Sequence, residues 1–300
     1  MKAIFFNKDS QLRNGWWIMI FIILTALTSL IYTPISKGLQ QLGFKVEWLG
    51  FLSVMFILLV SWICTRLMKK PLSSIGLSIN RRWFTLLTIG ILLGGLGVLL
   101  TVTLIWSVGG VTFSINPAIN GAMIALGIYM VATTALYEEL LFRGFLFQRL
   151  MKGIGVFAAQ GLLAILFAVG HWGNPGMDGV TQWIASIDLA LAAILFGLAY
   201  IRTQSLALPI GLHFGWNWFL GQVMGFGVSG IEQQSILTAS TLSTPNWLTG
   251  GSFGPEGSIF SVIVDLLFVF ILWRWKHWGL KPALTNDLSK PDSELPKPVL

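Results

Sequence analysis

Long runs of apolar residues, separated by short polar segments, make up most of the chain. Eight of these runs reach or approach the length of about 20 residues that a helix needs to cross a membrane. They cover residues 16–34, 48–68, 83–107, 121–148, 155–172, 184–201, 205–226 and 258–278. The pattern therefore predicts an all-α fold, a polytopic membrane bundle of about eight transmembrane helices.

The composition excludes the other common classes of protein. Hydrophobic residues make up 55% of the chain and charged residues only 10%, whereas a soluble domain carries about 25% charged residues. The single cysteine, Cys64, excludes a disulfide scaffold. The net charge of +7 does not indicate nucleic-acid binding, because the basic residues lie in short segments between apolar runs. We therefore expect the lipid bilayer, and no nucleic acid, as a partner.

The distribution of basic residues predicts the orientation of the chain. If successive runs cross the membrane in alternation, 17 of the 19 Lys and Arg residues fall on one side, and only Lys37 and Lys45 fall on the other. Cytoplasmic loops carry an excess of Lys and Arg. The pattern therefore predicts an integral, multi-pass membrane protein whose N- and C-termini are both cytoplasmic. Arg143 enters this count as a residue at the cytoplasmic end of the fourth run.

The runs and loops divide the chain into four parts. We expect an N-terminal three-span region at 1–120, a core of spans four to seven at 121–226, an outer loop with the last span at 227–281, and a disordered tail at 282–300. Pairs of glycines four residues apart, at a spacing that permits close helix packing, lie at Gly90 and Gly94, at Gly211 and Gly215, and at Gly221 and Gly225.

An ionisable residue inside a membrane span costs free energy, so its presence indicates a structural or functional role. Near the end of the fourth run, Glu138 and Glu139 are adjacent, and Arg143 follows four residues after Glu139. Residues four apart share a helix face, so Glu139 and Arg143 are placed to pair. Glu138 is rotated by about 100° from its neighbour, which leaves it free for chemistry such as that of a general base. A pair of acids in the headgroup region is the simpler alternative.

Two further runs carry polar residues. His171 ends the fifth run, and His213 and Asn217 share a face in the middle of the seventh. Alone, His171 is also compatible with an interfacial histidine, and the other two with a hydrogen-bonded pair between helices.

Four further residues are less informative on their own. Asp188 is a candidate supporting residue of the site, Asp265 has no motif around it, His277 is expected at the interface, and Cys64 in the core.

The three segments together form an ordered set: Glu-Glu-x-x-x-Arg, then Phe-x-x-x-His, then His-x-x-x-Asn. This set resembles the CAAX protease and bacteriocin-processing family of intramembrane proteases, which includes the type II CAAX prenyl endopeptidases. The similar region runs from Gly121 to Gly225. The resemblance implies a peptidase built into a helical bundle, with Glu139 and Arg143 completing its first motif.

The resemblance also assigns roles to the other motif residues. Glu138 resembles the carboxylate that activates water, and His171 resembles its partner at that water. His213 and Asn217 resemble the pair that binds the developing oxyanion. The implied substrate is a membrane-associated or lipidated peptide or protein. One difficulty remains, because the predicted topology puts Glu138 in the cytoplasmic half of its span and His171 near the outer end of the next.

Two questions stay open at this point. A divalent metal such as zinc would find ligands in Glu138, His171 and His213, but the chain has no His-Glu-x-x-His motif, and a metal-free glutamate mechanism uses the same side chains. Intramembrane acids and histidines also serve proton relays. A proton-coupled transporter is therefore an alternative function, and so is a non-catalytic membrane protein that protects or scaffolds another protein.

Overall fold

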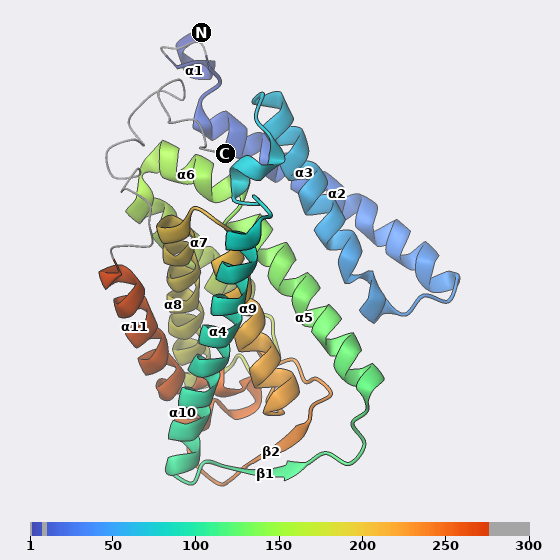
Figure 1. The fold of residues 1–300 in the computed structure, drawn as a ribbon, viewed down its shortest axis with the longest axis vertical. Coiled ribbons are helices and arrows are strands. Elements are labelled where there is room, and N and C mark those ends of the chain that lie inside the picture. Colours follow the sequence, from blue (N-terminus) through green and yellow to red (C-terminus); the bar gives the residue numbers. More distant parts are fainter. Residues whose placement is uncertain (1, 8–10, 276–300) are drawn as a thin grey trace.

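The computed structural model describes residues 2–7 and 11–275, and it is a bundle of helices (Figure 1). His277 and the segment 282–300 lie outside the described residues. The long helices are α2 (Asn14–Gln41), α3 (Gly50–Leu67), α4 (Arg81–Ser107), α5 (Gly121–Phe142), α7 (Val156–Gly170), α8 (Gly179–Thr203), α9 (Ala207–Asn217) and α11 (Ile259–Arg274). The shorter helices are α1 (Lys2–Phe5), α6 (Phe145–Ile154) and α10 (Asn246–Thr249). The predicted all-α class is confirmed.

Within the described residues, five helical segments are long and apolar enough to cross a membrane: Asn14–Gln41, Val46–Leu67, Arg81–Ser107, Gly121–Ile154 and Gly179–Thr203. The remaining apolar helices α7, α9 and α11 have 15, 11 and 16 residues, and α9 continues as a π-helix over Trp218–Val223. At 1.5 Å per residue, α7 and α11 span about 23–24 Å, which is less than the hydrocarbon thickness of about 30 Å. The chain is an integral membrane protein, and the number of eight spans stays a prediction.

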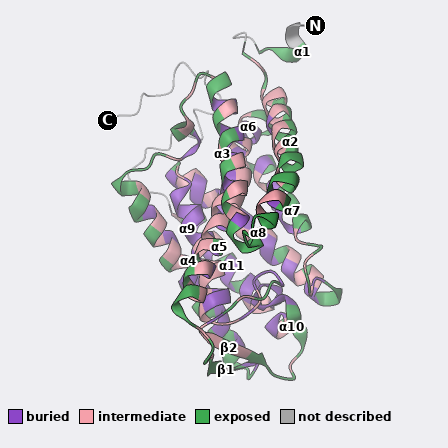
Figure 2. Cartoon of the chain, turned by 90° about the vertical axis from the view of Figure 1, so that its right-hand side faces the viewer, coloured by how far each residue is buried: buried purple, intermediate pink, exposed green. Residues whose placement is uncertain are grey.

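The helices fall into a packed bundle and a more exposed pair. Helices α2 and α3 lie side by side, and α3 also contacts α5. Both helices point away from the rest of the bundle (Figure 1). Only Phe21 and Ser36 of α2 are buried, and most of α2 is exposed in Figure 2. Its outer surface consists of large apolar side chains such as Leu30. An apolar helix surface of this kind is stable in contact with lipid.

The closest contact between helices joins α4 and α9. A Cβ atom on Gly90 would lie 2.6 Å from the carbonyl oxygen of Leu208, and one on Gly94 would collide with the carbonyl oxygen of Leu212. Added Cβ atoms on Gly211 and Gly215 would in turn collide with the backbone of α4. Two of the three glycine pairs therefore pack against each other, whereas Gly221 and Gly225 face residues of the segment 227–257. This contact brings the backbone of α9 against α4 and fixes the helix that carries His213.

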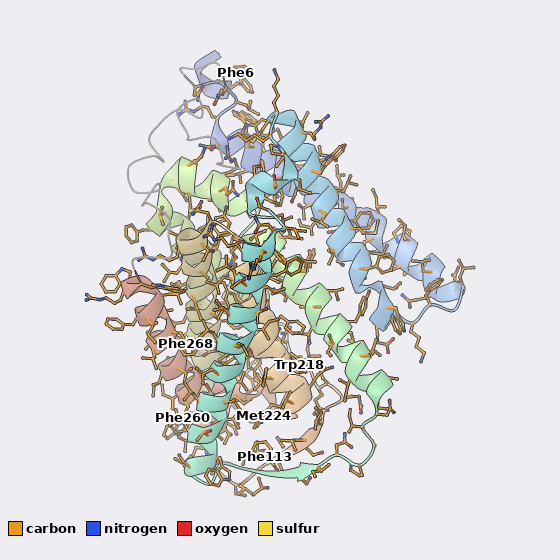
Figure 3. All side chains as sticks on the ribbon, viewed as in Figure 1. Phe6, Phe113, Trp218, Met224, Phe260 and Phe268 are labelled. Carbon is orange, nitrogen blue, oxygen red and sulfur yellow. The ribbon has the colours of Figure 1, made fainter. Side chains whose placement is uncertain are left out.

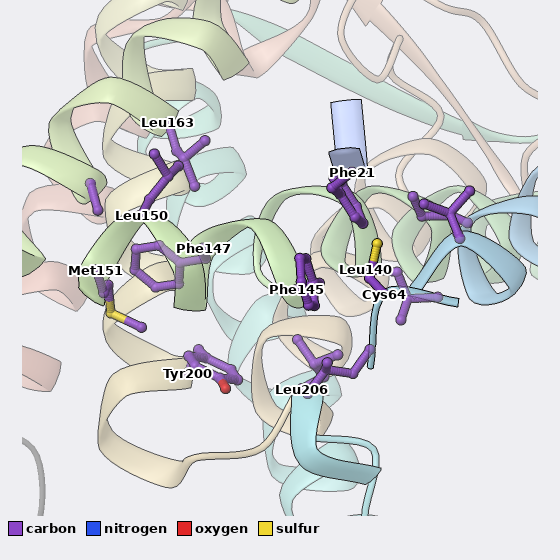
Figure 4. Packing of buried hydrophobic residues seen from close by; sticks show 14 of the residues in the cluster. Phe21, Cys64, Leu140, Phe145, Phe147, Leu150, Met151, Leu163, Tyr200 and Leu206 are labelled. Carbon is purple, nitrogen blue, oxygen red and sulfur yellow. The ribbon is translucent and has the colours of Figure 1, made fainter. Parts of the chain in front are cut away.

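A hydrophobic cluster ties α2 and α3 to the bundle through α6 (Figure 4). The Phe21 and Phe145 rings stack with their centroids 5.5 Å apart. Cys64 is fully buried in the same cluster, which confirms its predicted place in the core.

The predicted fourth run, 121–148, is interrupted in the structure. Helix α5 ends at Phe142, and a new amphipathic helix, α6, begins at Phe145. The break falls at Gly144, whose ψ of −127° is not helical. The expectation of one continuous helix was wrong at this point. The reason is local, because glycine carries no Cβ and accepts backbone angles that other residues avoid.

The segment 227–257 is not a simple loop. It contributes strand β2 (Leu237–Thr241), which pairs antiparallel with β1 (Val111–Ile115) from the α4–α5 connection. Phe113, Met224 and Phe260 gather near this small sheet (Figure 3) and belong to one apolar cluster. The apolar runs gave no signal for the sheet. Its consequence is that the segment 227–257 is anchored against the bundle, where it helps to enclose the site.

Candidate active site

A cavity of about 500 Å³ lies inside the bundle. Helices α5, α7, α8, α9 and α11 and the segment 227–257 contribute to its wall, which is mostly apolar. Four of the predicted site residues line it: Glu138, His171, His213 and Asn217. The structure therefore brings together side chains from three motifs that are far apart in the sequence.

Glu139 and Arg143 are buried next to this cavity and are not part of its lining. Glu139 Oε1 accepts hydrogen bonds from Arg143 Nη1 at 3.1 Å and from His213 Nδ1 at 3.0 Å. Glu139 Oε2 has no hydrogen-bond partner among the described residues. Arg143 also donates from Nη2 to the carbonyl oxygen of Ala193 at 3.0 Å. This network joins α5, α8 and α9 and positions His213.

The guanidinium of Arg143 is surrounded by aromatic rings. Its central carbon lies 5.1–5.6 Å from the ring centroids of Phe142, Phe167 and Phe196, distances that suit cation–π attraction. Only 2% of the residue is exposed. The predicted pairing of Glu139 with Arg143 is confirmed. This ion pair stabilises the guanidinium inside the bundle.

His213 connects the two glutamates. Because an ionised carboxylate can only accept, the hydrogen bond to Glu139 places a proton on His213 Nδ1. The other ring nitrogen, Nε2, lies 3.9 Å from Glu138 Oε2. The ring also stacks on Phe196, with centroids 5.1 Å apart. This arrangement fixes the plane of the imidazole and directs Nε2 toward the carboxylate of Glu138.

His171 follows directly after α7, and the same kind of argument fixes its tautomer. Its Nδ1 lies 2.7 Å from the carbonyl oxygen of Phe167. A carbonyl oxygen only accepts, so Nδ1 carries the proton and Nε2 keeps a lone pair. The predicted difference in depth between Glu138 and His171 is corrected here, because both line one cavity. Helix α6 separates α5 from α7, and α7 has only 15 residues.

Besides Glu138 and the exposed Glu232, three buried acids line the cavity. They are Asp188 on α8, Asp265 on α11 and Glu256 on the turn Pro255–Gly257. Sequence reasoning left Asp265 without a role, treated Asp188 only as a supporting residue and missed Glu256. The available signal was that 227–257 contains glutamates and no Lys or Arg to pair with them.

Glu256 is held by donors from two directions. Its Oε2 accepts from the backbone N–H and the hydroxyl of Ser229, and its Oε1 accepts from Trp216 Nε1 at 3.1 Å. Burial raises the pKa of Glu256, and the hydrogen bonds from Ser229 and Trp216 oppose that shift. The Ser229 carbonyl in turn accepts from Asn174 Nδ2 at 2.9 Å. Glu256 therefore fastens the segment 227–257 to α9 and, through Ser229, to the turn after α7.

The donor geometry does not fit the metal set considered from the sequence. Among the described residues, no three His, Cys, Asp or Glu side chains come close enough together to hold an ion. Glu138 and His213 approach each other, but His171 does not complete a ligand group with them.

The fold and the cavity define a polytopic membrane protein with a polar site enclosed among its helices. The family model described as type II CAAX prenyl endopeptidase Rce1-like matches residues 120–219. This segment contains all six predicted site residues, and the match confirms the resemblance inferred from the motifs for this third of the chain.

Among curated proteins, the chain is similar to uncharacterized protein YyaK of Bacillus subtilis (strain 168), with 29% identity over 158 residues. The match covers 51% of this chain and 49% of YyaK, so the chain spans about half the length of this relative. No solved structure gives a significant match.

Proposed function

We propose that the protein is an intramembrane endopeptidase that hydrolyses a peptide bond of a membrane-associated or lipidated protein or peptide. One observation carries the proposal. Glu138 Oε2 and His213 Nε2 lie 3.9 Å apart and line a 500 Å³ cavity together with His171 and Asn217. The match to the endopeptidase family over 120–219 supports the same reaction class.

The residues supply the parts that peptide hydrolysis needs. Glu138 is the general base that takes a proton from water, whose oxygen then attacks the carbonyl carbon of the substrate. Glu138 lines the cavity, and its Oε2 has no hydrogen-bond partner among the described residues, so this oxygen is not committed to another side chain. His171 Nε2 accepts a hydrogen bond from the same water and orients it. As the tetrahedral intermediate collapses, the peptide C–N bond breaks and protonated Glu138 returns the proton to the leaving amine.

The developing oxyanion needs hydrogen-bond donors. The side-chain amide of Asn217 is one donor. His213 is the second when its Nε2 is protonated, and the neighbouring carboxylates Glu138 and Glu139 favour that imidazolium by Coulomb attraction. One such donor typically contributes about 2.7–4 kcal/mol to transition-state stabilisation. Glu139 and Arg143 act as positioning residues, because they hold His213 in place and do not line the cavity.

The orientation in the membrane is part of the same proposal. The excess of Lys and Arg on one side of the alternating runs supports cytoplasmic N- and C-termini. This inference does not depend on Arg143, because most of the other basic residues still fall on that side.

The test compares protein termini in cells that lack the gene and carry the wild type, Glu138→Gln or Glu47→Gln at matched expression. Glu47 is an exposed carboxylate outside the cavity, so its variant is the control. We expect new termini with the wild type and Glu47→Gln and none with Glu138→Gln. If all three strains give the same termini while each restores the deletion phenotype, the peptidase proposal is wrong. A transporter or a scaffold then explains the protein better.

A further inference from the structure

The acids Asp188, Glu256 and Asp265, here called the acidic group, line the same cavity as the catalytic candidates but lie on different elements. All three are buried, with 2% of Asp188, 5% of Glu256 and 3% of Asp265 exposed. Burying an ionised carboxylate in an apolar medium is costly unless a positive charge or hydrogen-bond donors compensate it. The partners of each member therefore decide what the group can do.

Both carboxylate oxygens of Glu256 accept hydrogen bonds, whereas one oxygen of Asp188 accepts none from the described residues. Glu256 accepts hydrogen bonds from Ser229 and Trp216, as described above. Asp188 Oδ1 is buried and has no hydrogen-bond partner among the described residues. Asp265 and Glu256 add negative charge close enough to act on Asp188 electrostatically. Ser261 of α11 is close enough to act on Asp188 as a hydrogen-bond donor, so Asp188 is a buried carboxylate on the cavity wall with one oxygen, Oδ1, unpaired among the described residues.

The rest of the cavity lining adds no compensating cation. Among the described residues, no Lys or Arg lines the cavity. The glutamates Glu138 and Glu232 line it as well, and the two histidines are its only basic side chains. The lining therefore carries an excess of acidic groups, and a molecule that brought a positive charge to Asp188 would be attracted.

The size and apolar lining of the cavity indicate what kind of cation fits. A volume of about 500 Å³ greatly exceeds the roughly 30 Å³ of one water molecule. Leu189, Ala192 and Phe268 lie on the wall with the acids. Long basic side chains place an aliphatic stem against apolar surface and a charged head on a polar group. The chemistry thus matches Lys or Arg more closely than a bare ion.

We propose that the acidic group is a specificity subsite that accepts a Lys or Arg side chain of the peptide substrate, with Asp188 as the principal acceptor. The peptide nature of the ligand rests on the proposed peptidase function. The basic side chain enters the cavity, its stem lies along the apolar wall, and its N–H groups donate to the carboxylate of Asp188.

The test measures binding without cleavage. Protein carrying Glu138→Gln, which removes the proposed base, is reconstituted in nanodiscs. The two probes are acetyl-Leu-Leu-Lys-Leu-Leu-amide and the same peptide with norleucine in place of lysine, and empty nanodiscs correct for partition into lipid. Both peptides are acetylated, so the lysine ammonium is the only difference in charge. We expect the lysine peptide to bind at least about tenfold more tightly, which corresponds to about 1.4 kcal/mol.

Variants assign this preference to the acidic group. The double variant Asp188→Asn/Asp265→Asn keeps the side-chain shapes and removes both charges, and we expect it to bind the two peptides equally. Glu47→Gln lies outside the cavity and should keep the full preference. The proposal is wrong if protein with the native acidic group binds the two peptides equally. It is also wrong if the double variant still binds the lysine peptide more tightly.

The cut sites in cells provide an independent readout. If termini depend on Glu138, Lys or Arg should be enriched at one position near the cut with the wild-type acidic group, and the enrichment should disappear with Asp188→Asn/Asp265→Asn. Glu138-dependent cuts without such enrichment would overturn the subsite and leave the peptidase intact. A lysine preference in binding without any Glu138-dependent cut would support the subsite and reject the peptidase.

Discussion

Two groups of charged residues lie at one cavity, and Glu139 of the first group and Asp188 of the second are compensated in different ways. In the motif group, defined as Glu138, Glu139, Arg143 and His213, a buried guanidinium and an imidazole both donate to Glu139 Oε1. In the acidic group, Asp188 Oδ1 has no partner among the described residues. The difference separates two roles. Carboxylates paired within the chain hold the site in shape, and unpaired ones are available to molecules that enter the cavity.

The largest expected effect follows from breaking the paired network. Arg143→Met removes the charge that compensates buried Glu139, and the loss of one partner of a buried pair costs about 3–5 kcal/mol. Arg202→Met is the matched control, because Arg202 also donates to backbone carbonyls, those of Leu272 and Trp273, but pairs with no buried acid. The free energy of unfolding of each variant is measured in mixed micelles of increasing SDS content, with tryptophan fluorescence as the signal. If both variants lose the same free energy of unfolding, the pairing of Arg143 with Glu139 does not stabilise the bundle in the way proposed here.

A second experiment neutralises one acid from each group. Glu139→Gln weakens hydrogen bonds to a charged acceptor, which are worth about 1.5–3 kcal/mol, so the free energy of unfolding should fall by about that amount. Asp188→Asn removes a buried charge that no Lys or Arg of the cavity lining compensates among the described residues, and it should leave the free energy of unfolding unchanged or raise it. The same SDS titration measures both variants. A larger loss for Asp188→Asn than for Glu139→Gln would contradict the proposed division of roles.

The smallest expected effect concerns Glu256, which belongs to the acidic group but is hydrogen-bonded. Because burial raises its pKa above the ordinary value of 4.5, the folded protein binds this proton more tightly than the unfolded chain. Its contribution to stability is therefore present below about pH 4.5 and is lost as the pH rises through the raised pKa. Glu256→Gln should flatten the fall of stability with pH by at most about 1.4 kcal/mol per pH unit. Identical slopes in wild type and variant would reject this account.

The two groups also differ in how far the sequence predicts them. The motif group could be predicted because its residues fall in an ordered set, and because the spacing of Glu139 and Arg143 places them on one helix face. The acidic group comes from α8, α11 and the turn before α11. Only the packing of these elements brings its members together, so no local sequence pattern predicts the acidic group.

The fold shows the same limit. Apolar runs predicted the helices well, and the glycine spacing indicated surfaces for close packing on α4 and α9 without showing that these two helices contact each other. Runs of hydrophobicity do not show where a helix breaks, so the turn at Gly144 and the separate helix α6 were missed. The pairing of β1 with β2 joins segments more than 100 residues apart, and each strand is only five residues long. Such a contact has no signature in either segment alone.

The central claim is that Glu138 is the base of a peptide hydrolysis. The most direct measurement uses purified protein in nanodiscs and a peptide that spans a cut site found in cells, and compares initial rates for the wild type, Glu47→Gln and Glu138→Gln. Loss of a general base typically lowers the rate by about 10²–10⁴-fold. We predict a loss in this range for Glu138→Gln and an unchanged rate for Glu47→Gln. Cleavage by Glu138→Gln at the wild-type rate would contradict the account.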